Sequence, residues 1–448
     1  MKMKRLQKLS ETDAEVFELI RAELSRQEDG LEMIPSENFV SKAVLEAMGS
    51  VFTNKYSEGY PGKRYYGGNE FADKVENLAI ERAKKAFGVP HANVQPYSGT
   101  PANFAVYLAT CEAGDAIMGQ SLPDGGHLTH GWKTSFSGIF YKSVQYHVKA
   151  DGYLDIEEAR RLALEHKPKL IWVGASAYAR QFPFKELAGI ADEVGAYLAA
   201  DIAHISGLII GGVHPSPVQY AHIITTTTHK TLRGPRGAII MATEKGLLKD
   251  PELGKKLDKA VFPGLQGGPH DHTTAAIAVA LEEALQPEFR QYAQQIVRNA
   301  KALASGLMKS GLKLVSNGTD NHLMLIDLTP INKGHGVFAE AALDEAGITI
   351  NKNTIPQEPS SPFYPSGIRL GTPAITTRGM KEPEMEKIAQ WVAMVISETR
   401  KYALPTDKAG VSDYIKSFKE AIKQNTTIKK ARSEVKELCS RFPLYKEA

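Results

Sequence analysis

Short apolar segments alternate with amphipathic segments through the middle of the chain. Residues 170–174 and 197–200 are continuous apolar runs, and residues 184–194 between them carry apolar side chains at helical spacing. Residues 223–228 are all β-branched, which favours a further strand. Residues 238–242 predict a fourth strand that could return antiparallel. Because continuous apolar strands separated by helices are typical of a mostly parallel sheet covered on both faces, we expect an α/β fold.

The pattern on either side predicts more helices and a change of architecture. Residues 10–24 place apolar side chains at helical intervals behind a polar start, as in a capped amphipathic helix. Residues 70–87 and 273–308 also have helical patterning, whereas 323–328 predicts a strand. This change indicates a second, smaller α+β domain that starts near residues 285–300. The expected divisions are an N-terminal helical arm (1–50), a large α/β domain (51–285) and a small C-terminal α+β domain (286–448).

Composition narrows the class of protein. The 448 residues are 42% hydrophobic and 23% charged, which is usual for a globular protein of two or three units. With 54 basic and 51 acidic residues the net charge is only +3, so no global field points to nucleic acid or to a membrane surface, and small metabolites are the better expectation. The two cysteines, Cys111 and Cys439, have neither disulfide nor metal-ligand spacing. No signal sequence or run of about 20 apolar residues is present, so we expect a cytoplasmic protein.

Lys230 is the strongest candidate for chemistry. It follows the β-branched run at the carboxyl end of a predicted strand, where open α/β sheets place ligands. A lysine is most often a solvated surface charge. Here, however, the threonines at 225–228 and His229 supply hydrogen-bond donors, and burial near Arg233 and Arg236 would lower the pKa of the amine. A lysine that forms a Schiff base is therefore the sharper hypothesis.

Other polar groups are expected to meet Lys230. Ser176 and Asp201 follow two of the predicted strands, and parallel strands end at the same edge of a sheet. The Ser98-Gly99-Thr100 stretch precedes a helix that we expect to begin at Pro101. Its free N–H groups could bind a phosphate, although an ordinary helix cap explains it equally well. The glycine-rich residues 261–269 are a phosphate loop or a simple bend.

Two histidine pairs raise the question of a metal. His127 and His130 are three residues apart in a glycine-rich loop, and His270 and His272 flank an aspartate. Neither pair has a nearby third ligand with suitable spacing, so we expect no metal. Stacking of an imidazole on a planar ligand is the better interpretation of the first pair, and polar packing at a helix entry is the better one of the second.

Three further segments carry polar groups of uncertain role. Residues 56–69 form a loop with four tyrosines, a glutamate and two cations, which indicates packing against a partner subunit, the lining of a pocket, or both. Ser36 and Glu37 lie in a predicted loop and could approach a site, although Ser36 could also cap a helix. Arg369 stands alone in an apolar strand, so it needs either an internal carboxylate or a substrate carboxylate.

Together these groups match the needs of pyridoxal 5'-phosphate. Its aldehyde requires an amine, its ring nitrogen a carboxylate, and its phosphate hydrogen-bond donors. Lys230, Asp201 and the residues around Gly99 supply them, while Arg369 would hold the carboxylate of an amino-acid substrate.

A set of motifs in the same order also resembles a known family. The motifs are Ser36-Glu37-Asn38, residues 56–68, residues 125–131, Asp201-Ile202-Ala203-His204, residues 225–236, Gln266-Gly267-Gly268-Pro269 and residues 369–374. Across nearly the whole chain they resemble the serine hydroxymethyltransferases, pyridoxal-phosphate enzymes of the aspartate-aminotransferase fold (fold type I). The resemblance implies a large domain with a mostly parallel, seven-stranded type of sheet and reversible transfer of the serine hydroxymethyl group to tetrahydrofolate, giving glycine and 5,10-methylenetetrahydrofolate.

The resemblance also implies roles for cofactor-binding residues. Lys230 would form the Schiff base, Asp201 would pair with the ring nitrogen, and His127 would stack on the ring. Ser176 and His204 would lie near its phenolic oxygen. The remaining expected contacts are Ser98, Gly99 and Thr100 at the phosphate, Thr227 and His229, which strand packing could explain equally well, and Tyr56 and Gly268 from a partner subunit.

Substrate and folate contacts follow from the same resemblance. Arg369, Ser36 and Tyr66 would bind serine, and Glu58 would manage a proton on its hydroxyl or on the folate. The loops with Tyr56, Glu58, Tyr66 and Gly268 would reach across an obligate homodimer with shared active sites, and a tetramer is possible. The implied folate contacts are Glu58, Tyr65, Leu122, Gly126, Leu128 and Asn353.

Some features leave room for other readings. Pro35, the Thr100-Pro101 pair and Ala238 depart from the usual family residues, and residues 404–427 form a longer C-terminal part than expected. Residues 416–432 predict solvated helix faces. The alternative enzymes are a folate-independent threonine or β-hydroxy-amino-acid aldolase and an α-methylserine hydroxymethyltransferase. A nucleic-acid-binding protein that keeps the fold is disfavoured by the near-neutral charge.

Overall fold

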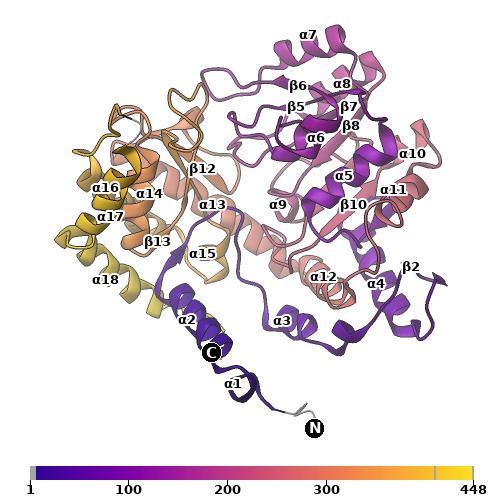
Figure 1. Ribbon diagram of the computed structural model, residues 1–448, viewed down its shortest axis with the longest axis horizontal. Helices are drawn as coiled ribbons and strands as arrows, with labels where there is room; N and C mark the ends of the chain where they lie inside the picture. Colours follow the sequence, from indigo (N-terminus) through magenta and orange to yellow (C-terminus); the bar gives the residue numbers. More distant parts are fainter. Residues whose placement is uncertain (1–6, 408–409, 446–448) are drawn as a thin grey trace.

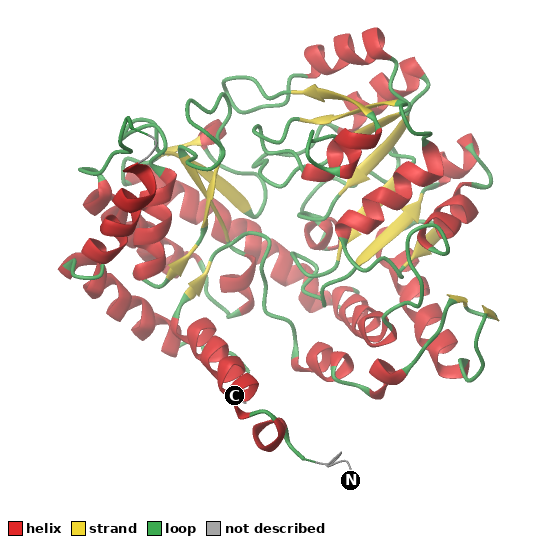
Figure 2. Ribbon diagram, viewed as in Figure 1, coloured by secondary structure: helices red, strands yellow, loops and turns green. Residues whose placement is uncertain are grey.

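The computed structural model describes residues 7–407 and 410–445, which fold into two lobes with a sheet in each (Figures 1 and 2). The sheet of the first lobe has seven strands. Neighbouring strands from β9 to β6 run parallel, while β10 pairs antiparallel with both β9 and β4. In spatial order the strands are β4 (His91–Asn93), β10 (Ala238–Ala242), β9 (Ile223–Thr227), β8 (Tyr197–Asp201), β7 (Leu170–Val173), β5 (Ala116–Gln120) and β6 (Lys142–Tyr146).

Both faces of this sheet are buried, as its continuous apolar strands predict. Ile171 and Val173 pack into one core, whereas the alternate residues Leu170 and Trp172 pack into a second core on the opposite face. The expected α/β fold with a mostly parallel sheet and an antiparallel β10 is confirmed. The helices of this lobe are α4 (Glu70–Phe87), α5 (Gly99–Thr110), α6 (Phe136–Phe140), α7 (Ile156–His166), α8 (Phe184–Val194), α9 (Ser206–Ile210), α10 (Glu244–Lys249), α11 (Leu253–Val261) and α12 (Asp271–Ala284).

The second lobe is built on a four-stranded antiparallel sheet with its own core. The long helix α13 (Pro287–Lys309) serves both lobes, because Phe289 packs into a core of the first lobe and Leu307 into that of the second. The expected domain boundary near 285 stays a prediction. The other elements are β11 (Lys313–Leu314), β12 (Leu323–Asp327), β15 (Gly367–Gly371), β14 (Asn351–Asn353), α14 (Gly336–Glu345), α15 (Pro373–Thr377), α16 (Glu382–Thr399), α17 (Val411–Ile422) and α18 (Thr426–Ser440).

The N-terminal segment contains the capped amphipathic helix that its pattern predicts, with Asp13 accepting from the Val16 N–H, and two features that the pattern does not reveal. Helices α1 (Leu9–Thr12) and α2 (Ala14–Asp29) project from the body of the chain, and α2 buries none of its residues, so its apolar stripe is exposed (Figure 1). The start of the predicted loop after α2 is a short strand, β1 (Leu31–Glu32), which pairs in parallel with β13 (Ile348–Thr349) of the second lobe. Backbone pairing with a strand more than 300 residues away cannot be seen in local patterning. Two short helices follow, α3 (Lys42–Met48) and η1 (Val51–Asn54).

Helix α5 begins earlier than predicted. Its first residue is Gly99, so Pro101 lies two residues inside the helix rather than at its start. The first four N–H groups of a helix have no intrahelical acceptor, and a proline is therefore tolerated at this position as well.

The C-terminal helices have solvated charged faces, but they also bury apolar ones. Phe418 and Ile422 of α17, and Ile428 and Val435 of α18, belong to the core of the second lobe. No helix in the described part of the chain is long and apolar enough to span a membrane. Cys111 and Cys439 are free thiols, as their spacing predicted.

Candidate active site

The carboxyl ends of β7, β8 and β9 bring polar groups together at one edge of the seven-stranded sheet. Asp201 is the last residue of β8, while Ser176 and Lys230 lie in the turns that follow β7 and β9. These side chains surround a small cavity of about 20 Å³, which we call the lysine cavity. Its lining consists of Gly99, His127, His130, Ala175, Ser176, Asp201, Ala203, His204, Thr227 and Lys230.

Lys230 is largely but not fully buried, and burial is the main reason why its pKa falls from 10.5 to about 8. Arg369 and Arg236 lower the pKa further, whereas Asp201 opposes the change. Arg233 instead lies over an aromatic ring, with its guanidinium carbon 4.6 Å from the centroid of Tyr292. An amine with this pKa is partly unprotonated near neutral pH and can act as a nucleophile.

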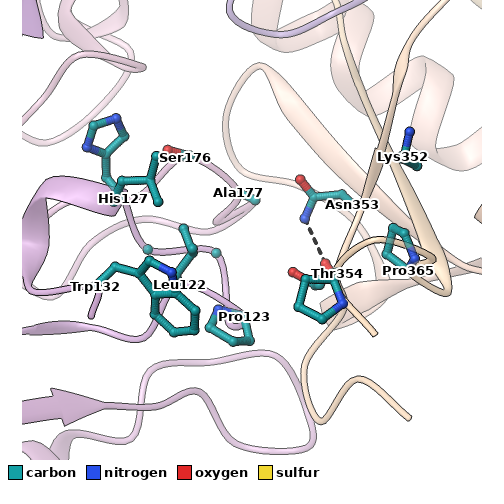
Figure 3. A pocket seen from close by; sticks show the side chains of 14 residues that line it. Leu122, Pro123, His127, Trp132, Ser176, Ala177, Lys352, Asn353, Thr354 and Pro365 are labelled. Atoms are coloured by element: carbon teal, nitrogen blue, oxygen red, sulfur yellow. Dashed lines mark hydrogen bonds between the residues drawn. The ribbon is translucent and has the colours of Figure 1, made fainter. Parts of the chain in front are cut away.

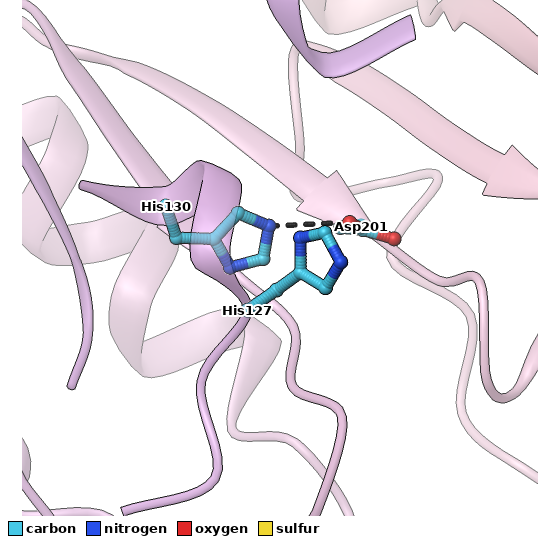
Figure 4. Close-up of side chains that lie close together, drawn as sticks. All are labelled: His127, His130 and Asp201. Carbon is cyan, nitrogen blue, oxygen red and sulfur yellow. Dashed lines mark hydrogen bonds and ion pairs between the residues drawn. The ribbon is translucent and has the colours of Figure 1, made fainter. Parts of the chain in front are cut away.

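Asp201 is a buried carboxylate held by three hydrogen bonds. Asn103 Nδ2 donates to it at 2.8 Å, the Ala203 N–H at 3.1 Å, and His130 Nε2 lies 3.1 Å from the same carboxylate (Figure 4). Burial alone would raise the pKa of Asp201, but the His130 hydrogen bond and nearby positive charge hold that pKa well below its ordinary value. The site therefore presents a negative charge opposite Lys230.

Asn103 and His130 were not among the residues predicted for the site. Asn103 lies on the otherwise apolar buried face of α5, and His130 is wholly buried with its ring parallel to Trp172 at 4.8 Å. A lone amide on an apolar helix face was the available signal for Asn103. For His130 the sequence offered only its spacing from His127.

His127, His130 and Asp201 form a group that could hold a metal ion, with ligand atoms within 4.8 Å of one another (Figure 4). Each member already has a hydrogen-bond partner, since His127 Nδ1 lies 2.7 Å from Thr129 Oγ1 and the other two bond to each other. Hydrogen bonding thus accounts for this cluster. The absence of a metal stays a prediction.

His127 is suited to stacking rather than to carrying charge. Burial lowers its pKa from 6.5 to about 4, so the ring is neutral at physiological pH. It lines the lysine cavity and also the larger neighbouring cavity described below. A planar ligand in the lysine cavity would meet this ring.

The start of α5 has the features of an anion site. Ser98 is the N-cap residue, yet its hydroxyl makes no capping hydrogen bond, so the ordinary cap interpretation is wrong. Thr227 Oγ1 is buried and has no hydrogen-bond partner among the described residues, and a Cβ added to Gly99 would lie 2.9 Å from Thr227 Cγ2. The first N–H groups of the helix and the Thr227 hydroxyl fit the donor needs of a phosphate. Thr100 lies in the same first turn.

Arg369 lies on β15 of the second lobe and is only 9% exposed. Its Nε donates to Asn351 Oδ1 at 2.9 Å, and its Nη1 donates to the backbone carbonyl of Ser176. Burial lowers its pKa from 12.5 to about 10. Within residues 7–407 and 410–445 no carboxylate pairs with it, which leaves a buried guanidinium fork free to bind an anion.

A larger cavity of about 320 Å³ lies between the lobes, beside the lysine cavity, and we call it the inter-lobe cavity (Figure 3). One wall comes from the loop that carries Leu122, His127 and Trp132, and the other from the strand and loop around Asn353 (Figure 3). Four of the residues predicted to touch folate line it, namely Leu122, Gly126, Leu128 and Asn353. His127 and Ser176 line both cavities, so the two cavities are adjacent.

The remaining predicted residues lie elsewhere in the single chain. Tyr56 donates to Glu58 at 3.1 Å, packs edge-on against Tyr66, and lies close to Gly268. This cluster, with the 75% exposed Tyr65, lines neither of the two cavities.

Ser36 and His229 line a third cavity, together with Arg236. The single chain therefore does not place Ser36 beside Arg369 in one cavity. His229 Nδ1 is buried and has no partner within the part of the chain that the structure describes, and burial lowers the pKa of His229 to about 3.

The comparisons with known proteins agree with the resemblance seen in the motifs. The family model described as serine hydroxymethyltransferase matches residues 9–392. A curated protein of Acidothermus cellulolyticus named serine hydroxymethyltransferase is 60% identical over 395 residues, which cover 88% of this chain and 90% of that protein.

Proposed function

The chain belongs to the serine hydroxymethyltransferase family, and we propose that the lysine cavity and the inter-lobe cavity together form its active site. The reaction is the reversible transfer of the hydroxymethyl group of serine to tetrahydrofolate, which yields glycine and 5,10-methylenetetrahydrofolate. Enzymes of this family generally depend on pyridoxal 5'-phosphate. The observation that carries our assignment is the placement of Lys230 and Asp201 at neighbouring strand ends in one cavity, where burial lowers the pKa of the amine to about 8.

The residues of the lysine cavity fit pyridoxal phosphate. The start of α5 and the unpaired hydroxyl of Thr227 suit the phosphate, and Asp201 would pair with the protonated ring nitrogen. His127, neutral because of its burial, would cover one face of the ring. When bound, the cofactor supplies an aldehyde that condenses with amines and a ring that withdraws electrons from the α-carbon of the substrate.

Arg369 would bind the serine carboxylate, and Lys230 would transfer protons. Arg369 would receive the serine carboxylate with the N–H groups that Asn351 and Ser176 leave free. Lys230, whose pKa lies near physiological pH, can accept and return protons at its Nζ. The carboxylate of Asp201 would keep the ring nitrogen charged throughout.

Tetrahydrofolate would occupy the inter-lobe cavity. Its wall of Leu122, Leu128, Trp132 and prolines offers apolar surface for a flat heterocycle, and the Asn353 amide offers polar contacts at the rim. Because this cavity adjoins the lysine cavity, a folate nitrogen could reach the hydroxymethyl group of a serine bound at Arg369.

The tyrosine cluster supports a homodimer with shared active sites. Tyr56, Glu58 and Tyr66 lie together at the surface, outside both cavities of their own chain, and Tyr56 and Tyr66 are about half exposed. A second copy could bring them, with Tyr65 and Gly268, to the open side of the site. There Glu58 would manage the proton of the serine hydroxyl, and Tyr66 would contact serine. Ser36, which lines the third cavity with His229 and Arg236, stays a predicted contact of the serine carboxylate.

A spectroscopic titration tests the assignment of Lys230. Adding pyridoxal phosphate to the purified chain should produce a visible absorption band from the lysine-linked cofactor, and the Lys230→Ala variant should not produce it. Lys245→Ala is a matched control, because Lys245 is a partly exposed lysine paired with Asp192 on the same lobe. A wild-type chain that stays colourless would refute the proposal.

Folate dependence separates the main function from the aldolase alternative. Glycine formation from serine should rise strongly when tetrahydrofolate is added. A Trp132→Ala change in the inter-lobe cavity should raise the KM for folate more than the KM for serine, since Trp132 lines only the inter-lobe cavity. Equal glycine formation with and without tetrahydrofolate would favour the aldolase.

A further inference from the structure

His322 is a buried histidine for which the proposed reaction gives no role. It directly precedes β12 in the second lobe and is 0% exposed. Its Nε2 lies 3.2 Å from Nδ1 of His204, and the two rings are 25° from parallel with 5.4 Å between their centroids. Because His204 lines the lysine cavity, this pair links a cavity-lining ring to the second lobe.

The segment that carries His322 is fixed against the first lobe. Asn321 Nδ2 donates to the backbone carbonyl of Tyr178 at 3.0 Å. The neighbouring Asp320 forms an ion pair with Arg180 at 2.9 Å. These contacts hold the imidazole of His322 at a constant position relative to the end of β7, so its hydrogen bond to His204 is part of a rigid arrangement.

Both rings are neutral. Burial, together with the nearby cations Arg369 and Lys230, lowers the pKa of His322 to about 3 and that of His204 well below its ordinary value. A neutral imidazole carries one proton, on either of its two nitrogens. The hydrogen bond between the rings therefore requires that one of the two facing nitrogens donates and the other accepts.

Only one of the two possible arrangements avoids a buried unpaired donor. If His204 donated from Nδ1, the proton of His322 would sit on its own Nδ1, which is buried and has no partner among the described residues. If His322 donates from Nε2, its Nδ1 is left as a bare lone pair. Unpaired buried N–H groups are rarer than unpaired buried acceptors, so the second arrangement is favoured.

We propose that His322 is a positioning residue that holds His204 in the tautomer with its proton on Nε2, so that His204 presents an N–H donor to the lysine cavity. This inference rests on the proposed function, in which the acceptor is the phenolic oxygen of pyridoxal phosphate. A donor at this oxygen stabilises its anionic form. His322 of the second lobe thus determines which nitrogen of the His204 ring, in the first lobe, carries the proton.

The tautomer can be read directly by nitrogen NMR on the full-length chain, purified without added cofactor and labelled with ¹⁵N in its histidine rings. Protonated and bare ring nitrogens give well-separated signals, and the chain has only 13 histidines to resolve. His204→Gln and His322→Gln assign the two rings by loss of their signals. His322→Gln also keeps an N–H donor near the place of Nε2, whereas His322→Leu removes it.

The wild-type chain should show His204 protonated at Nε2 only, and His322→Gln should keep that form. In His322→Leu the Nδ1 of His204 loses its donor, so the signal of this bare nitrogen should shift to that of an acceptor without a hydrogen bond. In the loaded enzyme, kcat should fall about tenfold in His322→Leu, as expected for the loss of one hydrogen bond, and recover to within about threefold of wild type in His322→Gln. The KM for serine should stay within about twofold in both variants.

His335→Leu is the matched control, because His335 is equally buried in the second lobe but bonds to Thr399. It should leave the His204 signals and kcat unchanged. The inference is overturned if wild-type His204 carries its proton on Nδ1, or if His322→Leu alters neither the His204 signals nor kcat. These outcomes are independent of the visible band of Lys230. A colourless chain with the expected histidine signals would refute the proposed function but leave the pairing of the two rings intact.

Discussion

Replacing Arg369 by leucine should separate substrate binding from stability. Arg369 is nearly fully buried, and it has hydrogen bonds to Asn351 and to the Ser176 carbonyl but no carboxylate partner in the described chain. A serine carboxylate would add two charge-assisted hydrogen bonds, each with a contribution of about 1.5–3 kcal/mol. Their loss, about 3–6 kcal/mol in all, corresponds to a fall in kcat/KM for serine of about 10²–10⁴-fold.

The same change should have little effect on folding. Two hydrogen bonds to Arg369 are lost, but so is the cost of burying an unpaired guanidinium, which amounts to several kcal/mol. The two effects oppose each other, so we expect the free energy of unfolding of the cofactor-free chain to stay within about 2 kcal/mol of wild type. Urea unfolding measures this quantity, and steady-state kinetics with varied serine measures kcat/KM.

Two related variants sharpen the test. Arg369→Lys keeps the positive charge but lacks the planar guanidinium that can make two parallel hydrogen bonds. Its kcat/KM should therefore lie between those of wild type and Arg369→Leu. Asn351→Ala leaves Arg369 in place but removes the acceptor of its Nε, and should lower kcat/KM by about tenfold. The reasoning is refuted if Arg369→Leu retains kcat/KM within tenfold of wild type, or if its main effect is unfolding.

Three further changes test buried polar groups. The pKa of Lys230 is about 8 in the folded chain against 10.5 ordinarily, so between these pH values the unfolded chain binds more protons than the folded one. From pH 8 to 10.5 the free energy of unfolding of the cofactor-free chain in urea should therefore rise by up to about 3 kcal/mol relative to that of Lys230→Met. The same pH dependence of this free energy in both proteins would contradict the prediction. Asn38 Nδ2 donates to the backbone carbonyl of Lys230 at 2.9 Å. Asn38→Ala should therefore lower kcat and reduce the free energy of unfolding by about 1–3 kcal/mol in a thermal melt. An unchanged melting temperature would contradict this. Arg64→Met leaves the 1% exposed side chain of Glu76 without its ion-pair partner, and should lower the free energy of unfolding in guanidinium by about 3–5 kcal/mol. The double variant with Glu76→Met should recover most of this loss.

The parts of the fold that follow from local chemistry were predictable. The β-branched run before Lys230 is β9, and the apolar runs before Ser176 and Asp201 are β7 and β8. Each run buries side chains on both faces of the sheet, so its composition alone identifies it as an interior strand. The convergence of the three strand ends then follows from their parallel direction.

Contacts made over long sequence separations were not predictable in the same way. His130 reaches Asp201, and His322 reaches His204, only because the chain returns to the same edge of the sheet. His130 ends the one-turn 3-10 helix Leu128–His130, and His322 lies in a loop just before β12, so no periodicity marks the direction of either side chain. The exposure of the apolar stripe of α2 could not be predicted either, since an amphipathic pattern reveals an apolar face but not what covers it.

In the proposed site the second lobe supplies Arg369 for the carboxylate of the amino acid and His322 beside His204, a residue that lines the lysine cavity. Arg369 on β15 and His322 beside β12 both come from strands that pair with each other, and each contacts a residue at the sheet edge of the first lobe, Ser176 and His204 respectively. A shift of the second lobe would therefore move the carboxylate-binding fork and the hydrogen bond to His204 together. In the proposed site, the binding of serine and the tautomer of His204 would therefore both depend on the position of this one antiparallel strand pair.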